Sequence, residues 1–256
     1  MDPSPREHVL NADPAIQLVL LEVQECDTRL TQLAHRASHL PESVTLADLD
    51  ARLKRVRDEV VAAETIASDL EDEQKRADRD VEQVRERRAR DQDLLDSGSI
   101  GDPKQLQSIQ SELENLARRQ TNLEDVELEI MERVEGARAA VAQLTGDRDA
   151  LIGERDTIAS RVADLLADIA DEKGIVDANR ARLAEGVPAD LLALYDKIRA
   201  DHGGLGAAPL HRGACQGCRL SLPPTEIEAL RAAAPDAVIR CEECRRILVR
   251  TSESGL

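Results

Sequence analysis

Aromatic residues are nearly absent from this chain of 256 residues, which contains no Phe, no Trp and a single tyrosine, Tyr195. Aromatic side chains supply much of the buried area of ordinary globular cores, so a large globular core is disfavoured. Long helices that pack through Ala, Leu and Val need no aromatic residue, and a richness in Ala, Glu, Arg, Leu and Asp is typical of them. The composition therefore predicts a mainly helical, coiled-coil protein.

Long hydrophobic runs and a secretory leader are also missing from the sequence. No stretch approaches the roughly 20 apolar residues of a transmembrane helix. Residues 1–14 lack the apolar core and the small-residue cleavage site of a signal peptide. Together with thiols in a metal-binding pattern, these absences predict a cytoplasmic protein that has no membrane partner.

Positive charge is in deficit, because 34 Lys and Arg residues stand against 51 Asp and Glu residues, which gives a formal net charge of −17. Such a surface repels phosphates, so binding of nucleic acid or anionic membrane across the whole surface is disfavoured. Catalytic patterns are missing too: the sequence shows no supported Ser/His/Asp or Cys/His arrangement and no phosphate-binding glycine loop. We therefore expect a protein that is not an enzyme and has no small-molecule substrate.

Cysteine is scarce but concentrated, since four of the five cysteines form two Cys-x-x-Cys pairs near the end of the chain. A spacing of two residues lets both thiolates of a tight turn face one ion, and two such turns fill a tetrahedron completely. Thiolates prefer zinc or an iron–sulfur centre to magnesium or calcium. A redox dithiol is usually single and near a βαβ pattern, and disulfides suit small secreted domains. The pattern favours one structural Zn²⁺ bound by Cys215, Cys218, Cys241 and Cys244.

Heptad repeats of apolar residues predict a coiled coil through most of the chain before the cysteine pairs. A first helix runs from about residue 14 to 40, with Asp13 as its cap and Cys26 as a buried residue of its seam. Pro41 ends this helix, because a proline pushes the preceding residue out of helical geometry. A second helix with its own apolar seam follows, and Thr45 is its predicted cap.

A polar turn separates this second helix from a long return helix. Residues 96–103 contain two glycines, a proline and short polar side chains, and Asp102 with Pro103 suits the start of a new helix. The return helix extends to about residue 185, so two helices in series are predicted to pack antiparallel against one. The alternative, parallel pairing of long helices between two chains, is disfavoured by the Gly/Pro turn.

The position of the turn also predicts which polar residues meet across the hairpin. If the turn is centred near residue 100, partners have residue numbers that add up to about 200. Gln74 is then expected near Glu127. Arg88 is expected near Glu112 and Glu114.

The chain divides into three predicted parts: a coiled-coil hairpin at 1–188 with its tip near 96–103, a short helix and linker at 189–208, and a C4 zinc ribbon at 209–256. Within the ribbon, Thr225 is expected to start a short helix through a capping box. Residues 237–240 and 247–250 are predicted as short β-strands beside the second cysteine pair. The fold class is therefore mainly α, a long antiparallel coiled-coil hairpin with a small zinc ribbon.

Four segments resemble the bacterial C4-type zinc-ribbon proteins that carry a long N-terminal coiled-coil hairpin. These segments read GDPKQLQSIQSELENLARRQ, DLLALYDKIR, CQGC and CEECRRIL. The resemblance implies the four zinc ligands named above and an adaptor or regulator that is not an enzyme. It also implies links of such proteins to an alternative sigma factor, to flagellar biogenesis and to RNA binding. The sequence departs from many zinc knuckles at Arg219 and Arg245, where glycine often follows the second cysteine.

Two hypotheses for function follow. The first is a protein-interaction adaptor, because a stalk with a closed metal site presents separate surfaces and no reaction chamber. The alternative is RNA or DNA binding by ribbon arginines, which could contact phosphates, although acidic neighbours nearly balance them and the ribbon has no aromatic residue for base stacking. The adaptor is favoured. Predicted tip contacts are Ser97, Ile100, Lys104 and Gln105, and predicted ribbon contacts are Arg212, Arg219, Arg240, Arg245, Arg246 and Arg250.

Overall fold

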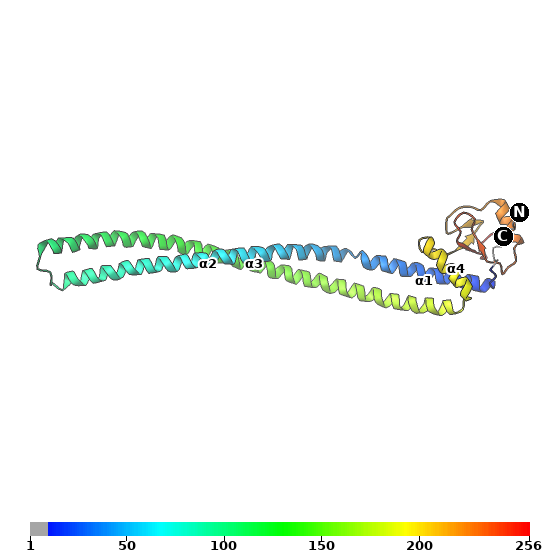
Figure 1. Ribbon diagram of the computed structural model, residues 1–256, viewed down its shortest axis with the longest axis horizontal. Coiled ribbons are helices and arrows are strands. Elements are labelled where there is room, and N and C mark those ends of the chain that lie inside the picture. The colour runs from blue at the N-terminus through cyan, green and yellow to red at the C-terminus, as the bar shows by residue number, and fades with distance from the viewer. Residues whose placement is uncertain (1–9) are drawn as a thin grey trace, which may run out of the picture. The chain divides into compact units, whose positions relative to one another are not determined.

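Residues 10–256 are described by a computed structural model, which confirms the mainly helical fold (Figure 1). The predicted start of the hairpin at residue 1 lies outside the described residues. In chain order the elements are α1 (Pro14–Ser38), α2 (Pro41–Asp96), α3 (Pro103–Glu185), α4 (Ala189–Asp201), β1 (Ala207–His211), β2 (Ala214–Cys215), α5 (Pro224–Ala232), β3 (Ile239–Arg240) and β4 (Ile247–Val249). No helix among these residues is long and apolar enough to cross a membrane.

The start of each long helix depends on a proline in its first turn. Asp13 caps α1 as predicted, because its Oδ1 accepts the Ala15 amide at 2.8 Å. The predicted start of the second helix at Thr45 is wrong, since α2 begins at Pro41. Proline has no N–H to leave unpaired and its fixed φ suits the first turn, so the residue that limits α1 also opens α2.

Two compact units make up the described residues. Unit 2, residues 42–160, contains α2 and the first part of α3 side by side. Their apolar residues form the predicted seam, in which Leu49, Leu53 and Leu151 make one buried cluster and Leu70 another. The tip follows the prediction, with α2 ending at Asp96 and the Lys104 amide 3.0 Å from Oδ1 of the capping residue Asp102. The hairpin is therefore formed within one chain.

Most polar contacts across this hairpin are displaced from the predicted register by several residues, although Arg87 and Glu112 keep it. Arg88 Nη1 lies 3.0 Å from Gln120 Oε1, and Arg87 binds Glu112 instead. Glu127 meets Asp78, and burial, followed by this contact, raises the pKa of Glu127. Helical side chains lean toward the N-terminus of their own helix. Those of α2 thus lean away from the tip and those of α3 toward it, which displaces contacts to higher numbers on α3.

Unit 1 joins residues 10–41 to residues 161–256. The last part of α3 lies along α1, and α4 and the ribbon pack against α1 as well (Figure 1). Tyr195 of α4 is completely buried in this core. Gly206 passes so close to Tyr195 that an added Cβ would lie 2.7 Å from the ring, so no larger residue fits there.

The ribbon sheet has the strand order β2-β1-β4-β3. The predicted strands around the second cysteine pair are present as β3 and β4, which pair antiparallel. Strand β1 was not predicted; it pairs parallel with β4 and antiparallel with β2. The predicted Thr225 cap is wrong, because α5 begins at Pro224 without a side-chain cap. The segment before α1 is joined to the ribbon, since the Ala12 amide donates to Asp236 O at 2.7 Å.

Candidate metal centre

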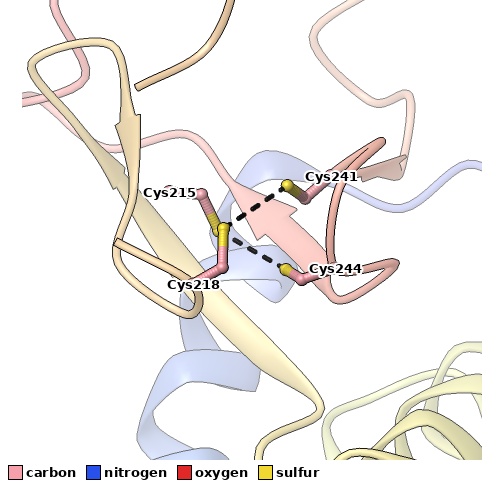
Figure 2. Close-up of side chains that lie close together, drawn as sticks. All are labelled: Cys215, Cys218, Cys241 and Cys244. Atoms are coloured by element: carbon pink, nitrogen blue, oxygen red, sulfur yellow. Dashed lines mark hydrogen bonds between the residues drawn. The ribbon is translucent and has the colours of Figure 1, made fainter. Parts of the chain in front are cut away.

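The four paired cysteines come together at one point of the ribbon (Figure 2). Their sulfur atoms all lie within 4.8 Å of one another, and the Cys215–Cys244 and Cys218–Cys241 Sγ distances are 3.8 and 4.0 Å. Four sulfurs held about 2.3 Å from a tetrahedral zinc are about 3.8 Å apart. None of the four forms a disulfide. The cluster therefore fits one structural Zn²⁺ with four protein ligands and no open position.

Each Cys-x-x-Cys pair is held in the same tight turn. The Arg219 amide donates to Cys215 O at 2.7 Å, and the Arg245 amide donates to Cys241 O at 2.8 Å. Both arginines have left-handed backbones, with φ of 62° and 61°. These are the positions at which zinc knuckles often use glycine, so the expected turn is formed despite the non-glycine residues.

The thiols differ in how readily they ionise. Burial raises the pKa of Cys215 and of Cys241, while backbone amides of their own turns, such as that of Gly217, partly offset this rise. Burial also raises the pKa of Cys244, but hydrogen bonds from the backbone and side chain of Arg246 bring it below its ordinary value. Buried thiolates need a compensating cation, and zinc supplies that charge when it is bound.

Arg246 also links the metal centre to residues 202–206, the joint that follows α4. Its Nε and Nη2 lie 3.0 Å from the carbonyl oxygens of Leu205 and His202, and its Nη1 lies 3.5 Å from Gly217 O between the first two cysteines. Gln24 of α1 holds the same joint, with Nε2 2.9 Å from Gly204 O and Oε1 2.6 Å from the Gly206 amide. The knuckle and α1 therefore both bind the joint.

Three of the six arginines predicted as contacts donate to backbone carbonyls of the ribbon and the joint. Besides Arg246, Arg250 Nη2 lies 2.7 Å from Ala234 O just beyond α5. Arg240 Nε lies 3.0 Å from Arg245 O. The remaining arginines of the set, Arg212, Arg219 and Arg245, share left-handed backbones. The predicted tip contacts Ser97, Ile100, Lys104 and Gln105 lie in unit 2.

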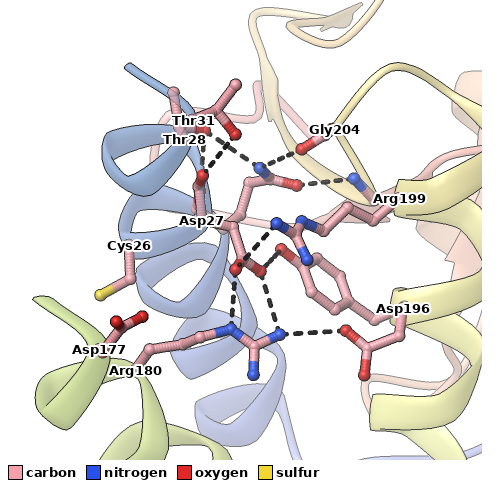
Figure 3. A network of polar contacts seen from close by, with 12 residues as sticks. Cys26, Asp27, Thr28, Thr31, Asp177, Arg180, Asp196, Arg199 and Gly204 are labelled. Carbon is pink, nitrogen blue, oxygen red and sulfur yellow. Dashed lines mark hydrogen bonds and ion pairs between the residues drawn. The ribbon is translucent and has the colours of Figure 1, made fainter. Parts of the chain in front are cut away.

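A buried polar network beside the ribbon was not predicted (Figure 3). Asp27 is 1% exposed and accepts from Arg180 Nε at 2.7 Å, from the Tyr195 hydroxyl at 2.7 Å and from Arg199 Nη2 at 3.3 Å. Burial, followed by the bond to Asp27, raises the pKa of Tyr195. Arg180 also binds Asp196 at 3.1 Å. The network joins α1, α3 and α4 through one carboxylate.

A signal for this network was present in the sequence of α1. Its buried residues include a second stripe, Gln17, Leu20, Gln24 and Asp27, beside the heptad seam. These residues are spaced three, four and three apart, which is one face of a helix. Because three of the four are polar, a search for apolar periodicity passes over them.

We expect Arg219→Gly to stabilise the zinc-loaded ribbon by about 1 kcal/mol, because a β-carbon at φ 62° is strained and glycine is not. Denaturant unfolding followed by the fluorescence of Tyr195 measures the change. Arg219→Ala is the matched control, since it removes the same guanidinium but keeps the β-carbon. An equal gain from alanine would show that strain is not the cause.

Comparison with known families matches residues 23–203 to a CT398-like coiled coil hairpin domain and residues 214–248 to a C4-type zinc ribbon domain. An uncharacterized protein of Mycobacterium tuberculosis strain H37Rv is 36% identical over 244 residues, which is 94% of this chain and 98% of that protein. An uncharacterized protein of Mycobacterium leprae is 27% identical over 86% of this chain and 94% of its own length.

Two solved structures share the fold along nearly the whole chain. A Mycobacterium smegmatis protein gives a TM-score of 0.82 at 33% identity and covers 94% of this chain and 100% of its own. CT398 from Chlamydia trachomatis gives a TM-score of 0.64 at 18% identity and covers 93% of this chain and 98% of its own. The likeness of fold therefore extends over both the hairpin and the ribbon of this chain.

Proposed function

This chain belongs to the CT398-like coiled-coil hairpin family and carries a C4-type zinc ribbon, and from this we propose that it is a non-enzymatic adaptor that binds other proteins. The architecture fits a structural scaffold. The proposal includes a cytoplasmic location, which is supported by five cysteines that form no disulfide.

The observation that carries the proposal is the closed metal centre. All four positions of a tetrahedral ion are taken by cysteine sulfurs, two of which, in Cys215 and Cys241, are completely buried. Catalytic zinc sites keep a position for water or substrate. A metal with four protein ligands stabilises the fold. The proposed function therefore depends on the surfaces of the protein and not on chemistry at the metal.

Nucleic-acid binding by the ribbon is the alternative, and its support is weaker. Arg240, Arg246 and Arg250 already donate to backbone carbonyls, so their guanidinium groups have fewer donors left for phosphates. The chain as a whole carries a net charge of −17. Binding to short RNA that weakens steeply as salt rises would support this alternative.

We expect the amount of protein partner captured by the double variant Ile100→Glu/Lys104→Glu to be at least about tenfold lower than for the wild type. The experiment is affinity capture of the tagged protein from its native cell, with and without nuclease, followed by quantitative mass spectrometry. Val61→Glu is the control, because Val61 is an exposed apolar residue of the same unit but lies away from the tip in sequence. Partners that vanish with nuclease would favour the nucleic-acid alternative, and an unchanged partner set in the tip variant would rule out the tip.

A further inference from the structure

A groove with a volume of about 890 Å³ lies within unit 1, between α1, the last part of α3 and β1. We call it the α1–β1 groove and define it by Leu21, Cys26, Ile175, Val176, Ala208 and Pro209. Most of these side chains are apolar, and Ile175 is 71% exposed. Figure 3 shows Cys26 pointing away from the Asp27 carboxylate, so this cysteine faces the groove while the carboxylate faces Arg180 and Tyr195.

Two of the three charged residues that line the groove are acidic. Glu22 and Glu25 of α1 line it, are exposed and form no ion pair with any described residue. Arg29 also lines the groove, but its guanidinium is paired with Glu172. The two unpaired carboxylates stand three residues apart on one helical face, where a partner with basic side chains could pair with both.

The groove wall offers little to an added β-strand. Pro209 has no N–H, and its carbonyl oxygen already accepts the Gln216 amide at 3.1 Å. The amides of Gly206 and Ala207 both donate to Gln24 Oε1, at 2.6 and 3.3 Å. Addition of a strand requires free main-chain groups, whereas a helix binds a groove through its side chains. The wall therefore suits a helix.

We propose that the α1–β1 groove binds a cationic amphipathic helix of a protein partner. Apolar residues of that helix cover Ile175 and Leu21, and its Lys or Arg residues pair with Glu22 and Glu25. The inference rests on the proposed adaptor function and deepens it by giving the chemistry of one partner segment. The ribbon side of the groove is fixed by Arg246, which holds the carbonyls of Leu205 and Gly217.

The test uses fluorescein-labelled peptides of about 18 residues, long enough for five helical turns. One peptide has a leucine face and a lysine face, and the other has glutamate in place of lysine. Fluorescence anisotropy with the zinc-loaded full chain is expected to show saturable binding of the lysine peptide. Ile175→Glu should weaken this binding at least about tenfold, whereas Leu220→Glu, at an exposed leucine outside the groove, should leave it unchanged.

Charge reversal provides the second arm. Glu22→Lys/Glu25→Lys should reverse the preference from the lysine peptide to the glutamate peptide. The control Glu132→Lys/Glu135→Lys makes the same change in net charge at the same spacing in unit 2, and should keep the lysine preference. The proposal is overturned by no saturable binding of the lysine peptide, by an Ile175→Glu variant that binds it normally, or by equal effects of the two charge reversals. If the lysine peptide does not bind but capture of a protein partner still depends on the tip, only the groove proposal is overturned and the adaptor function is retained.

Discussion

Cys241→Ser is expected to abolish zinc binding and to unfold the ribbon while leaving the helices of unit 2 intact. Loss of a residue that merely supports a ligand weakens metal binding 10–100-fold, so loss of a ligand should cost more than about 100-fold. The buried cluster at the ribbon consists of a few aliphatic residues around the cysteines, with no aromatic residue. Structural zinc supplies about 10–16 kcal/mol of apparent binding free energy in small domains, so such a core depends on it.

Metal analysis of the purified protein measures the first effect, with one zinc per chain expected for the wild type and almost none for the variant. Amide hydrogen exchange localises the second effect to β1–β4 and α5. Cys26→Ser is the matched control, because Cys26 is a buried cysteine outside the cluster and should keep its zinc. A Cys241→Ser protein that holds a full equivalent of zinc, or whose ribbon exchanges as slowly as the wild type, would contradict a structural metal.

Features that depend on local sequence were predicted correctly. The seam of unit 2 follows from a seven-residue repeat of apolar residues. The metal ligands follow from two Cys-x-x-Cys pairs, each with two residues between its cysteines. The tip follows from glycine and proline in residues 96–103. Each of these patterns is complete within a short stretch, so no knowledge of distant contacts is needed.

The errors have two physical origins. Helices α2 and α5 begin at Pro41 and Pro224, ahead of the predicted caps Thr45 and Thr225, because a fixed φ and a missing N–H suit a helix start. Strand β1 and the Asp27 network depend instead on partners far away in sequence, such as Arg180 for Asp27. A short run such as residues 207–211 has no periodicity that separates a strand from a linker, so only pairing with β4 defines it.

We expect Asp27→Ala to lower the free energy of unfolding of unit 1 by about 3–5 kcal/mol. The variant leaves Arg180, Arg199 and the Tyr195 hydroxyl without their common acceptor in a site where Asp27 is 1% exposed. Removing one partner of a buried ion pair costs more than the pair itself contributes, because the remaining groups stay partly desolvated; here the arginine side chains are only 24% and 30% exposed. Denaturant unfolding followed by the fluorescence of Tyr195 reads this network directly, since no other residue of the chain is aromatic apart from histidine.

Asp177→Asn is the control for removing a carboxylate of the same unit. Asp177 pairs with Lys173 on the surface of α3, with side chains 44% and 58% exposed, and such a pair is worth at most about 1 kcal/mol. A second variant, Tyr195→Phe, removes one donor but keeps the charge pairing, so it should cost only about 1–2 kcal/mol, measured by thermal circular dichroism. If Asp27→Ala costs no more than Asp177→Asn, the arginines reach water in the folded protein and the network does not fasten α3 and α4 to α1. A cost several times larger would mean that one carboxylate holds the three helices together, so that the α1 wall of the groove is fixed independently of the zinc.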